Sequence, residues 1–197
     1  MKTKIFWVVF VLLYTITAVC LMLGFSSETK AVDEPLSISS EEVEEEEVSE
    51  VGVLTKTYYD IPLDYELQDH IFTVSESYGI DPTLVIAVIH KESTFHADSI
   101  GDNGNSLGLM QVQPKWHQAR MNKYNCHDLL DPYQNIIVGV DYLAEMLGKY
   151  NTVEGALMAY NAGPSKANGY ISKGIVTDYA KTVLNYKSNL KTIEMGV

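Results

Sequence analysis

Cysteine is scarce in this sequence, which limits how the protein can be stabilised. The chain has two cysteines, Cys20 inside an apolar run and Cys126 alone in the C-terminal part. A domain with one cysteine cannot form an internal disulfide, so it depends on its hydrophobic core, for which about 130 residues suffice. The five histidines show no spacing typical of a metal site, and the loop at 102–105 lacks the alternating ligands of a calcium loop. We therefore expect neither a metal ion nor a cofactor.

Basic residues are also few, and many of the acidic ones are gathered in one segment. Against 26 Asp and Glu the chain has 14 Lys and Arg, which gives a formal net charge of −12. Residues 28–50 hold ten acidic residues, one lysine and no aromatic residue. Such a segment cannot bury enough apolar surface to fold, so we expect a disordered acidic linker over residues 28–56. The sequence offers no basic patch, which argues against nucleic-acid binding.

One long apolar run lies near the N-terminus. Residues 5–25 contain no charged side chain, and as a helix they would span about 31 Å, close to the thickness of a bilayer core. Because Lys2 and Lys4 precede the run, a membrane anchor would leave the N-terminus in the cytoplasm and the rest of the chain outside. The alternative is a signal peptide cleaved near Ser26 or Ser27, which would give a secreted protein. The expected organisation is an anchor or signal at 1–27, the linker at 28–56 and a domain at 57–197.

The apolar residues beyond the linker follow a mostly helical pattern. They recur at helical spacing in several segments, some of which begin at an Asp or Thr that can cap a helix or at a proline. The expected helices cover residues 63–78, 82–92, a segment from 114, 132–147, 152–161 and 177–190, with a strand or two in the loop before Gln111. Gly163 and Pro164 should halt the helix through Asn161. We expect Trp116 to lie in the core, although an exposed indole there would suit a sugar.

Glu92 stands at the end of the second of these helices, which starts at Asp81 and Pro82. The apolar residues of this helix, among them Val88 and Ile89, lie on the same face as Glu92. Burial disfavours an ionised carboxylate, so the pKa of Glu92 should rise, and a proton held near neutral pH is what a general acid needs. The alternative is an exposed glutamate in the last turn of a core helix.

Three short motifs follow one another along the domain. Glu92-Ser93 comes first, Gly108-Leu109-Met110-Gln111 second, and Ala159-Tyr160-Asn161-Ala162-Gly163 third. In this order and at these separations, the set resembles the soluble-type lytic transglycosylases and the related goose-type lysozymes. The resemblance covers roughly residues 63–190. It implies a mainly α, lysozyme-like helical domain that acts on the glycan strands of peptidoglycan.

The resemblance also implies roles for the motif residues. Glu92 would be the single acid and base that cleaves the β-1,4 bond between N-acetylmuramic acid and N-acetylglucosamine to give 1,6-anhydro-muramic acid ends. Ser93, Gln111 and Asn161 would bond to the sugar or its N-acetyl group. Met110 would form an apolar wall, Tyr160 would hold Glu92 or the substrate through its hydroxyl, and Gly108 would let the backbone approach a ligand. The alternatives from the residues alone are a turn former at Ser93, a core residue at Met110 and a packing ring at Tyr160.

Two other functions stay open at this point. Asp102 occupies the place where goose-type lysozymes have an Asp that helps to position water, so it is a possible second carboxylate for hydrolysis of the same bond. Against this, Gln113 stands where those lysozymes have another Asp, and an Asp in an Asp-Asn-Gly loop is usually a turn former. The third possibility is a non-catalytic module that only binds peptidoglycan.

Overall fold

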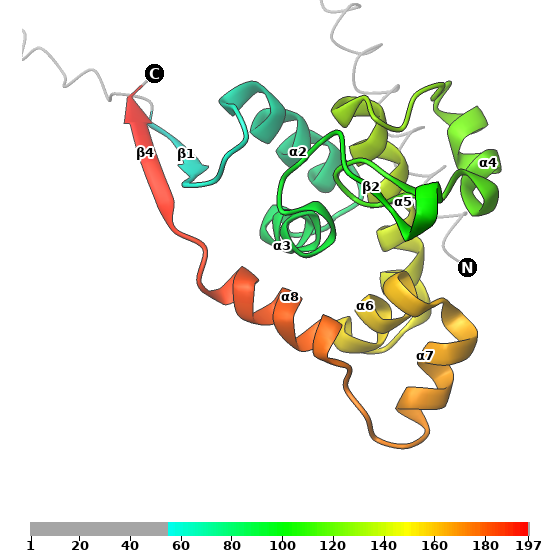
Figure 1. The fold of residues 1–197 in the computed structure, drawn as a ribbon. Helices are drawn as coiled ribbons and strands as arrows, with labels where there is room; N and C mark the ends of the chain where they lie inside the picture. The colour runs from blue at the N-terminus through cyan, green and yellow to red at the C-terminus, as the bar shows by residue number, and fades with distance from the viewer. Residues whose placement is uncertain (1–54, 197) are drawn as a thin grey trace, which may run out of the picture. The chain divides into compact units, whose positions relative to one another are not determined.

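The computed structural model describes residues 55–196 of the chain (Figure 1). The predicted anchor at residues 5–25 and nearly all of the predicted linker lie outside the described residues. Within residues 55–196, none of the helices combines the length and the apolar character that a membrane crossing requires.

Helices make up most of this part of the chain. In chain order the elements are β1 (Thr55–Tyr59), α2 (Tyr65–Ser77), α3 (Pro82–Ser93), β2 (Ile100–Gly101), the 3-10 turn η1 (Asp102–Gly104), β3 (Ser106–Leu107), α4 (Pro114–Lys123), α5 (Pro132–Lys149), α6 (Val153–Ala162), α7 (Pro164–Ile171), α8 (Asp178–Ser188) and β4 (Thr192–Gly196). The mainly α fold expected from the sequence is confirmed.

Several helices begin at the caps that the sequence indicates. The side chains of Asp81, Asp131 and Thr152 each accept a backbone N–H in the first turn of α3, α5 and α6 respectively. Proline follows both aspartates directly, at a position where a helix needs no N–H. The predicted starts of these three helices are confirmed.

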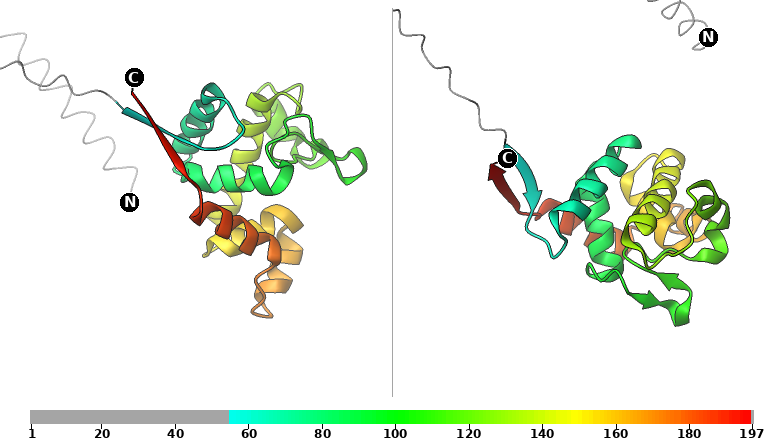
Figure 2. Two further views of the ribbon diagram at one scale, coloured as in Figure 1. Left: turned by 60° about the vertical axis from the view of Figure 1, so that its left-hand side comes forward. Right: turned by 90° about the horizontal axis from the view of Figure 1, so that it is seen from above.

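Helix α3 forms the centre of the hydrophobic core. Six consecutive residues, Leu84 to Ile89, are all buried, so neighbouring elements cover this helix on every side. It packs against α2 and α8 and lies between them (Figures 1 and 2). Helix α5 packs on α2, α4 and α6. The last turn of α3, where Glu92 stands, therefore follows directly on a buried segment of the helix.

Helix α7 is not among the helices expected from the sequence. Gly163 and Pro164 end α6, as expected, but a new helix, α7, begins at Pro164. Proline cannot continue a helix, but its fixed φ suits the first position of the next one. Gly163 has a φ of 80°, which is unfavourable for other residues, and it makes the corner between α6 and α7.

A second difference is the pairing of the two end strands. Strands β1 and β4 are antiparallel, with Thr55 opposite Gly196 and Tyr59 opposite Thr192. Figure 2 shows them side by side. Strand formation depends on the partner that a segment meets, and here the partner lies at the far end of the domain, so the local sequence did not reveal it.

Candidate active site

Glu92 lines a cavity of about 860 Å³, which we call the Glu92 cleft. Helix α3 ends just after it, and Thr94 and Phe95 turn the chain away with φ of 51° and 67°. The cleft residues come from the loop around η1, from α4 and α5, and from the junction of α6 and α7. They are Glu92, Asp102, Ser106, Gln111, Val112, Gln113, Trp116, His117, Arg120, Tyr142, Glu145, Met146, Tyr160, Asn161, Ala162, Gly163, Pro164 and Lys166. This volume lies within the usual range for ligand sites.

Burial determines the acidity of Glu92. Loss of hydration raises the pKa of its carboxyl from 4.5 to about 7, because the ionised form is the one that water stabilises most. Tyr179 on α8 donates a hydrogen bond of 2.5 Å to Oε1 of Glu92. This bond and the charge of Lys91 lower the pKa, but by less than burial raises it. The predicted direction is confirmed, and Glu92 can hold or release a proton near neutral pH.

Tyr179, rather than Tyr160, is the tyrosine bonded to Glu92. The hydroxyl of Tyr160 donates to the carbonyl oxygen of Met110 at 2.9 Å and thereby ties α6 to the loop before α4. The predicted bond from Tyr160 to Glu92 is therefore wrong for this structure. Tyr160 still lines the cleft, where burial and the neighbouring Glu92 raise its pKa well above the ordinary value. Its contact with the substrate stays a prediction.

Gln111 lines the cleft in a fixed conformation. Its backbone has a φ of 48°, and its Nε2 donates to the carbonyl oxygens of Gly108 at 2.9 Å and of Ser99 at 3.2 Å. Strands β2 and β3, expected in this region, form the short hairpin that leads to it. A Cβ atom on Gly101 would lie 2.3 Å from Oε1 of Gln111, so the glycine leaves room for this side chain.

Ser93 and Met110 do not line the cleft. The hydroxyl of Ser93 donates to the carbonyl oxygen of Ile89, one turn back in α3, at 3.2 Å. Met110 is fully buried and packs on α5, where a Cβ atom at Gly139 would lie 2.8 Å from its own Cβ. The structure thus gives Ser93 a place as the last residue of its helix and Met110 a place in the core, which for Met110 agrees with the alternative that the residues alone left open.

Asn135 on α5 fastens the loop that holds Gln111. Its buried side chain accepts the N–H of Met110 at 2.8 Å and donates to the carbonyl oxygens of Leu107 and Leu129, each at 2.8 Å. Gly108 has a φ of 72°, and a Cβ there would lie 2.4 Å from Nδ2 of Asn135. Gly108 therefore permits a close approach, as predicted, but the group that approaches in this structure belongs to the protein.

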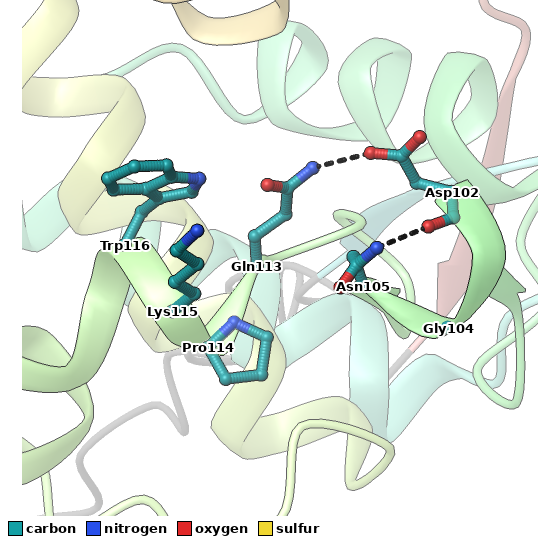
Figure 3. Close-up of a pocket in the computed structure, with 7 residues that line it drawn as sticks. All are labelled: Asp102, Gly104, Asn105, Gln113, Pro114, Lys115 and Trp116. Carbon is teal, nitrogen blue, oxygen red and sulfur yellow. Dashed lines mark hydrogen bonds between the residues drawn. The ribbon is translucent and has the colours of Figure 1, made fainter.

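Asn161 and Asp102 line the cleft together with Glu92. Asn161 is exposed near the C-terminal end of α6. Asp102 opens the turn η1 with a φ of 53°, and its Oδ2 accepts a hydrogen bond of 3.0 Å from Nε2 of Gln113 (Figure 3). Asp102 is thus a turn residue and a cleft residue at once, and its role as a second carboxylate stays a prediction.

The wall of the cleft formed by α4 and α5 contains several charged groups. Arg120 pairs with Asp141 at 3.4 Å, contacts Glu145, and donates to Nδ1 of His117 at 3.2 Å. Burial and the charge of Arg120 lower the pKa of His117 to about 4, so this imidazole is neutral at pH 7. These residues belong to none of the three motifs, and no local sequence pattern marks them as part of a site. Within residues 55–196, no group of three or more His, Cys, Asp and Glu side chains is arranged to hold a metal ion.

Trp116 is another cleft residue, and its expected place in the core is wrong. The side chain is 69% exposed. The buried side of α4 is formed by His117 and Met121, so Trp116, next to His117, points away from the core. The size and apolar character of tryptophan favoured burial, whereas the orientation of the helix decides its exposure.

Comparisons with known proteins identify the family of this chain. The chain matches the family model "Transglycosylase SLT domain" over residues 69–181, more than half of its length. It is 36% identical over 98 residues to the transglycosylase of Enterobacteria phage PRD1, covering 50% of this chain and 35% of that protein. It is 32% identical over 120 residues to the invasion protein IagB of Salmonella typhimurium, covering 58% of this chain and 72% of that protein.

A solved structure shows the same fold. The 70 kDa soluble lytic transglycosylase Slt70 of Escherichia coli superposes with a TM-score of 0.56 at 23% identity, covering 65% of this chain and 24% of that chain. The match thus spans about a third of the phage protein and about a quarter of the Escherichia coli enzyme. With its helical lysozyme-like fold, its Glu92 cleft and a family match over residues 69–181, the chain belongs to the transglycosylase SLT domain family.

Proposed function

We propose that this chain is a peptidoglycan lytic transglycosylase, with Glu92 as its single acid and base. The bond cleaved is the β-1,4 bond between N-acetylmuramic acid and N-acetylglucosamine. The observation that supports this most directly is the carboxyl of Glu92, which has a pKa of about 7 and lines a cleft of about 860 Å³. Membership of the SLT family supports the class of reaction.

The proposed reaction uses the same carboxyl twice. Protonated Glu92 gives its proton to the glycosidic oxygen, so the bond between that oxygen and C1 of muramic acid breaks and N-acetylglucosamine leaves. The Glu92 carboxylate then accepts the proton of the 6-hydroxyl of the same muramic acid, and the freed oxygen bonds to C1. The product is a 1,6-anhydro ring, no water is consumed, and Glu92 ends protonated. A pKa near 7 suits both proton transfers.

The polar residues of the cleft would orient the sugar. Both bonds of the Gln111 Nε2 go to backbone carbonyls, so Oε1 is the atom that Gln111 offers to a donor such as the N–H of an N-acetyl group. Asn161 is exposed near the C-terminal end of α6 and also lines the cleft, so its amide is available to the sugar. Holding the 6-hydroxyl near C1 is the main task, because an attached and oriented nucleophile reacts far faster than a free one.

Hydrolysis of the same bond differs from this proposal in its product. Asp102 lines the cleft, but the amide of Gln113 donates to its Oδ2. In a hydrolytic enzyme a carboxylate in this place would instead have to activate a water molecule. The nature of the muramic acid end therefore separates the two reactions.

The test is digestion of purified peptidoglycan by the full-length protein, with mass spectrometry of the products. We expect 1,6-anhydro-muramic acid ends, and Glu92→Gln should reduce the rate by about 10²- to 10⁴-fold. Glu76→Gln, which alters an exposed glutamate of α2 outside the cleft, should leave the rate unchanged. Reducing muramic acid ends without any anhydro form would reject the transglycosylase, and an unchanged rate in Glu92→Gln would reject Glu92 as the acid.

The stability of Glu92→Gln shows whether its loss of cleavage comes from the missing acid or from unfolding. The pKa of the Glu92 carboxyl is about 7 in the folded protein, against a reference value of 4.5 that stands for the unfolded chain. The stability that the protonated carboxyl gives the folded protein is therefore fully present below pH 4.5 and is lost as the pH rises through 7. Glutamine has no charge to bury. At pH 8 the free energy of unfolding of Glu92→Gln should therefore exceed that of the wild type by about 1–3 kcal/mol, as measured by urea unfolding.

A further inference from the structure

Helix α8 contacts the last turns of α3 on two different sides. His90 and Glu92 stand two positions apart in α3, which places them about 200° apart around the helix. Helix α8 reaches both of them, because Tyr179 bonds to Glu92 and the ring of Tyr186 stacks on His90. In Figure 1 α3 is seen end-on and α8 runs across it. Helix α8 is therefore fixed to α3 at two separate points.

The contact between His90 and Tyr186 is a close stack of two flat rings. Their centres lie 3.6 Å apart and their planes differ by 10°. Phe95 is buried beside them, with its ring centre 5.5 Å from that of His90. Within residues 55–196 the buried Nδ1 of His90 has no hydrogen-bond partner. Burial and the charge of Lys91 lower the pKa of His90, so the ring is neutral at pH 7 and stacks as an uncharged group.

The spacing along α8 links this stack to the bond on Glu92. Tyr179, Val183 and Tyr186 recur at positions i, i+4 and i+7, so they lie on one face of the helix, with the fully buried Val183 between the two tyrosines. The tyrosines are about 10 Å apart along the axis. If α8 were held at Val183 alone, a small swing would move the Tyr179 hydroxyl, and a hydrogen bond weakens steeply when its geometry changes.

We propose that His90 is a positioning residue, whose stack on Tyr186 holds α8 in the orientation that keeps the hydroxyl of Tyr179 on Glu92. The proposal rests on the proposed function, which makes Glu92 the acid. His90 does not line the Glu92 cleft, so it acts on the carboxyl only through α8. Val183 keeps α8 packed when the stack is lost, so the hydration of Glu92 should change little and the bond from Tyr179 should be what weakens.

The pKa of Glu92 reports on this bond without any need for catalysis, because the bond lowers it. We would titrate the full-length protein with ¹³C-labelled glutamate carboxyls by NMR and assign the Glu92 signal from its loss in Glu92→Gln. His90→Ala should raise the pKa of Glu92 by up to about one pH unit. His90→Phe keeps a flat ring and should restore the wild-type value. His127→Ala, which alters an exposed histidine between α4 and α5, is the matched control and should leave it unchanged.

A double variant separates this route from general disturbance of the helix. In Tyr179→Phe the bond is already absent, so adding His90→Ala should cause no further rise in the pKa of Glu92. Tyr186→Ala removes the stack from the other side and should raise the pKa as much as His90→Ala does. A further rise in the double variant, or a pKa of Glu92 that stays unchanged or falls in both His90→Ala and Tyr186→Ala, would overturn the proposal.

Kinetics on peptidoglycan separate this proposal from the one on which it rests. In His90→Ala the fall of kcat/KM at high pH should move upward by the same amount as the pKa of Glu92, with little change in KM, because His90 does not line the cleft. If the pKa rises as expected but the wild type cleaves no peptidoglycan, the positioning role stands and the proposed reaction is rejected. If cleavage depends on Glu92 but His90→Ala leaves its pKa unchanged, the reaction stands and the positioning role is rejected.

Discussion

At the scale of single residues, two opposing effects act on the carboxyl of Glu92. Burial raises its pKa, and the hydrogen bond from Tyr179 lowers it. Tyr179 is itself largely buried, and burial and the neighbouring Glu92 raise the pKa of its hydroxyl well above the ordinary value, so it stays a donor. The pair thus combines an acid that holds its proton near neutral pH with a donor that stabilises the same group once the proton has left.

This balance predicts a pH profile. Activity should fall as the pH rises above about 7, because Glu92 then loses the proton that it must donate. Tyr179→Phe removes the bond that favours the carboxylate, so the pKa of Glu92 rises and the fall should move upward by about one pH unit. The measurement is kcat/KM against pH. Tyr186→Phe, on the same helix, should keep the wild-type profile, and a fall that moves to lower pH in Tyr179→Phe would contradict this account.

The sequence revealed some of the site residues and not others for a physical reason. Glu92 could be singled out as a candidate acid, because helical spacing puts it on the apolar face of α3 and because it begins the Glu92-Ser93 motif. Tyr179 could not, because it is 87 positions away and meets Glu92 only when α8 packs on α3. Trp116 was misplaced because its exposure depends on which side of α4 faces the core, and its neighbour His117 takes the buried position.

At the scale of elements, the loop before α4 depends on one amide in α5. Asn135→Ala would leave the N–H of Met110 and the carbonyls of Leu107 and Leu129 without their partner. We expect the free energy of unfolding to fall by about 2–4 kcal/mol, because buried polar groups without partners are costly. Urea unfolding measures this loss.

The matched control for Asn135 is Asn122, an exposed asparagine near the end of α4. Asn122→Ala should change the free energy of unfolding by less than about 0.5 kcal/mol. A similar small effect in Asn135→Ala would show that the loop is held by other contacts. The rate of peptidoglycan cleavage by Asn135→Ala should fall by more than the fraction of unfolded protein accounts for, because Gln111 belongs to the loop that Asn135 holds.

The elements themselves were predictable where their signals are local. Asp81 and Asp131 cap α3 and α5, and a proline after each marks the start, so their positions followed from a few adjacent residues. Helix α7 was missed because a proline after a glycine reads as a stop, although it also suits a new start. Strands β1 and β4 were missed because each is stabilised by a segment at the other end of the domain.

At the scale of the whole molecule, the sequence predicts where the domain works. We propose that residues 5–25 anchor the chain in the membrane and that the acidic linker lets the domain reach peptidoglycan outside the cytoplasm. In cell fractionation the full-length protein should sediment with membranes, and removal of residues 1–27 should leave it in the cytosol. A mature protein that begins near residue 27, as shown by N-terminal sequencing, would replace the anchor with a cleaved signal.

The pairing of β1 with β4 has a mechanical consequence for the domain. Because Thr55 lies opposite Gly196, the first and last residues of the sheet are neighbours. Tension applied between these two ends would open the pairs one after another, starting at Thr55, instead of loading all five at once. Stretching would therefore detach the two strands at low force before it disturbs the helices around Glu92.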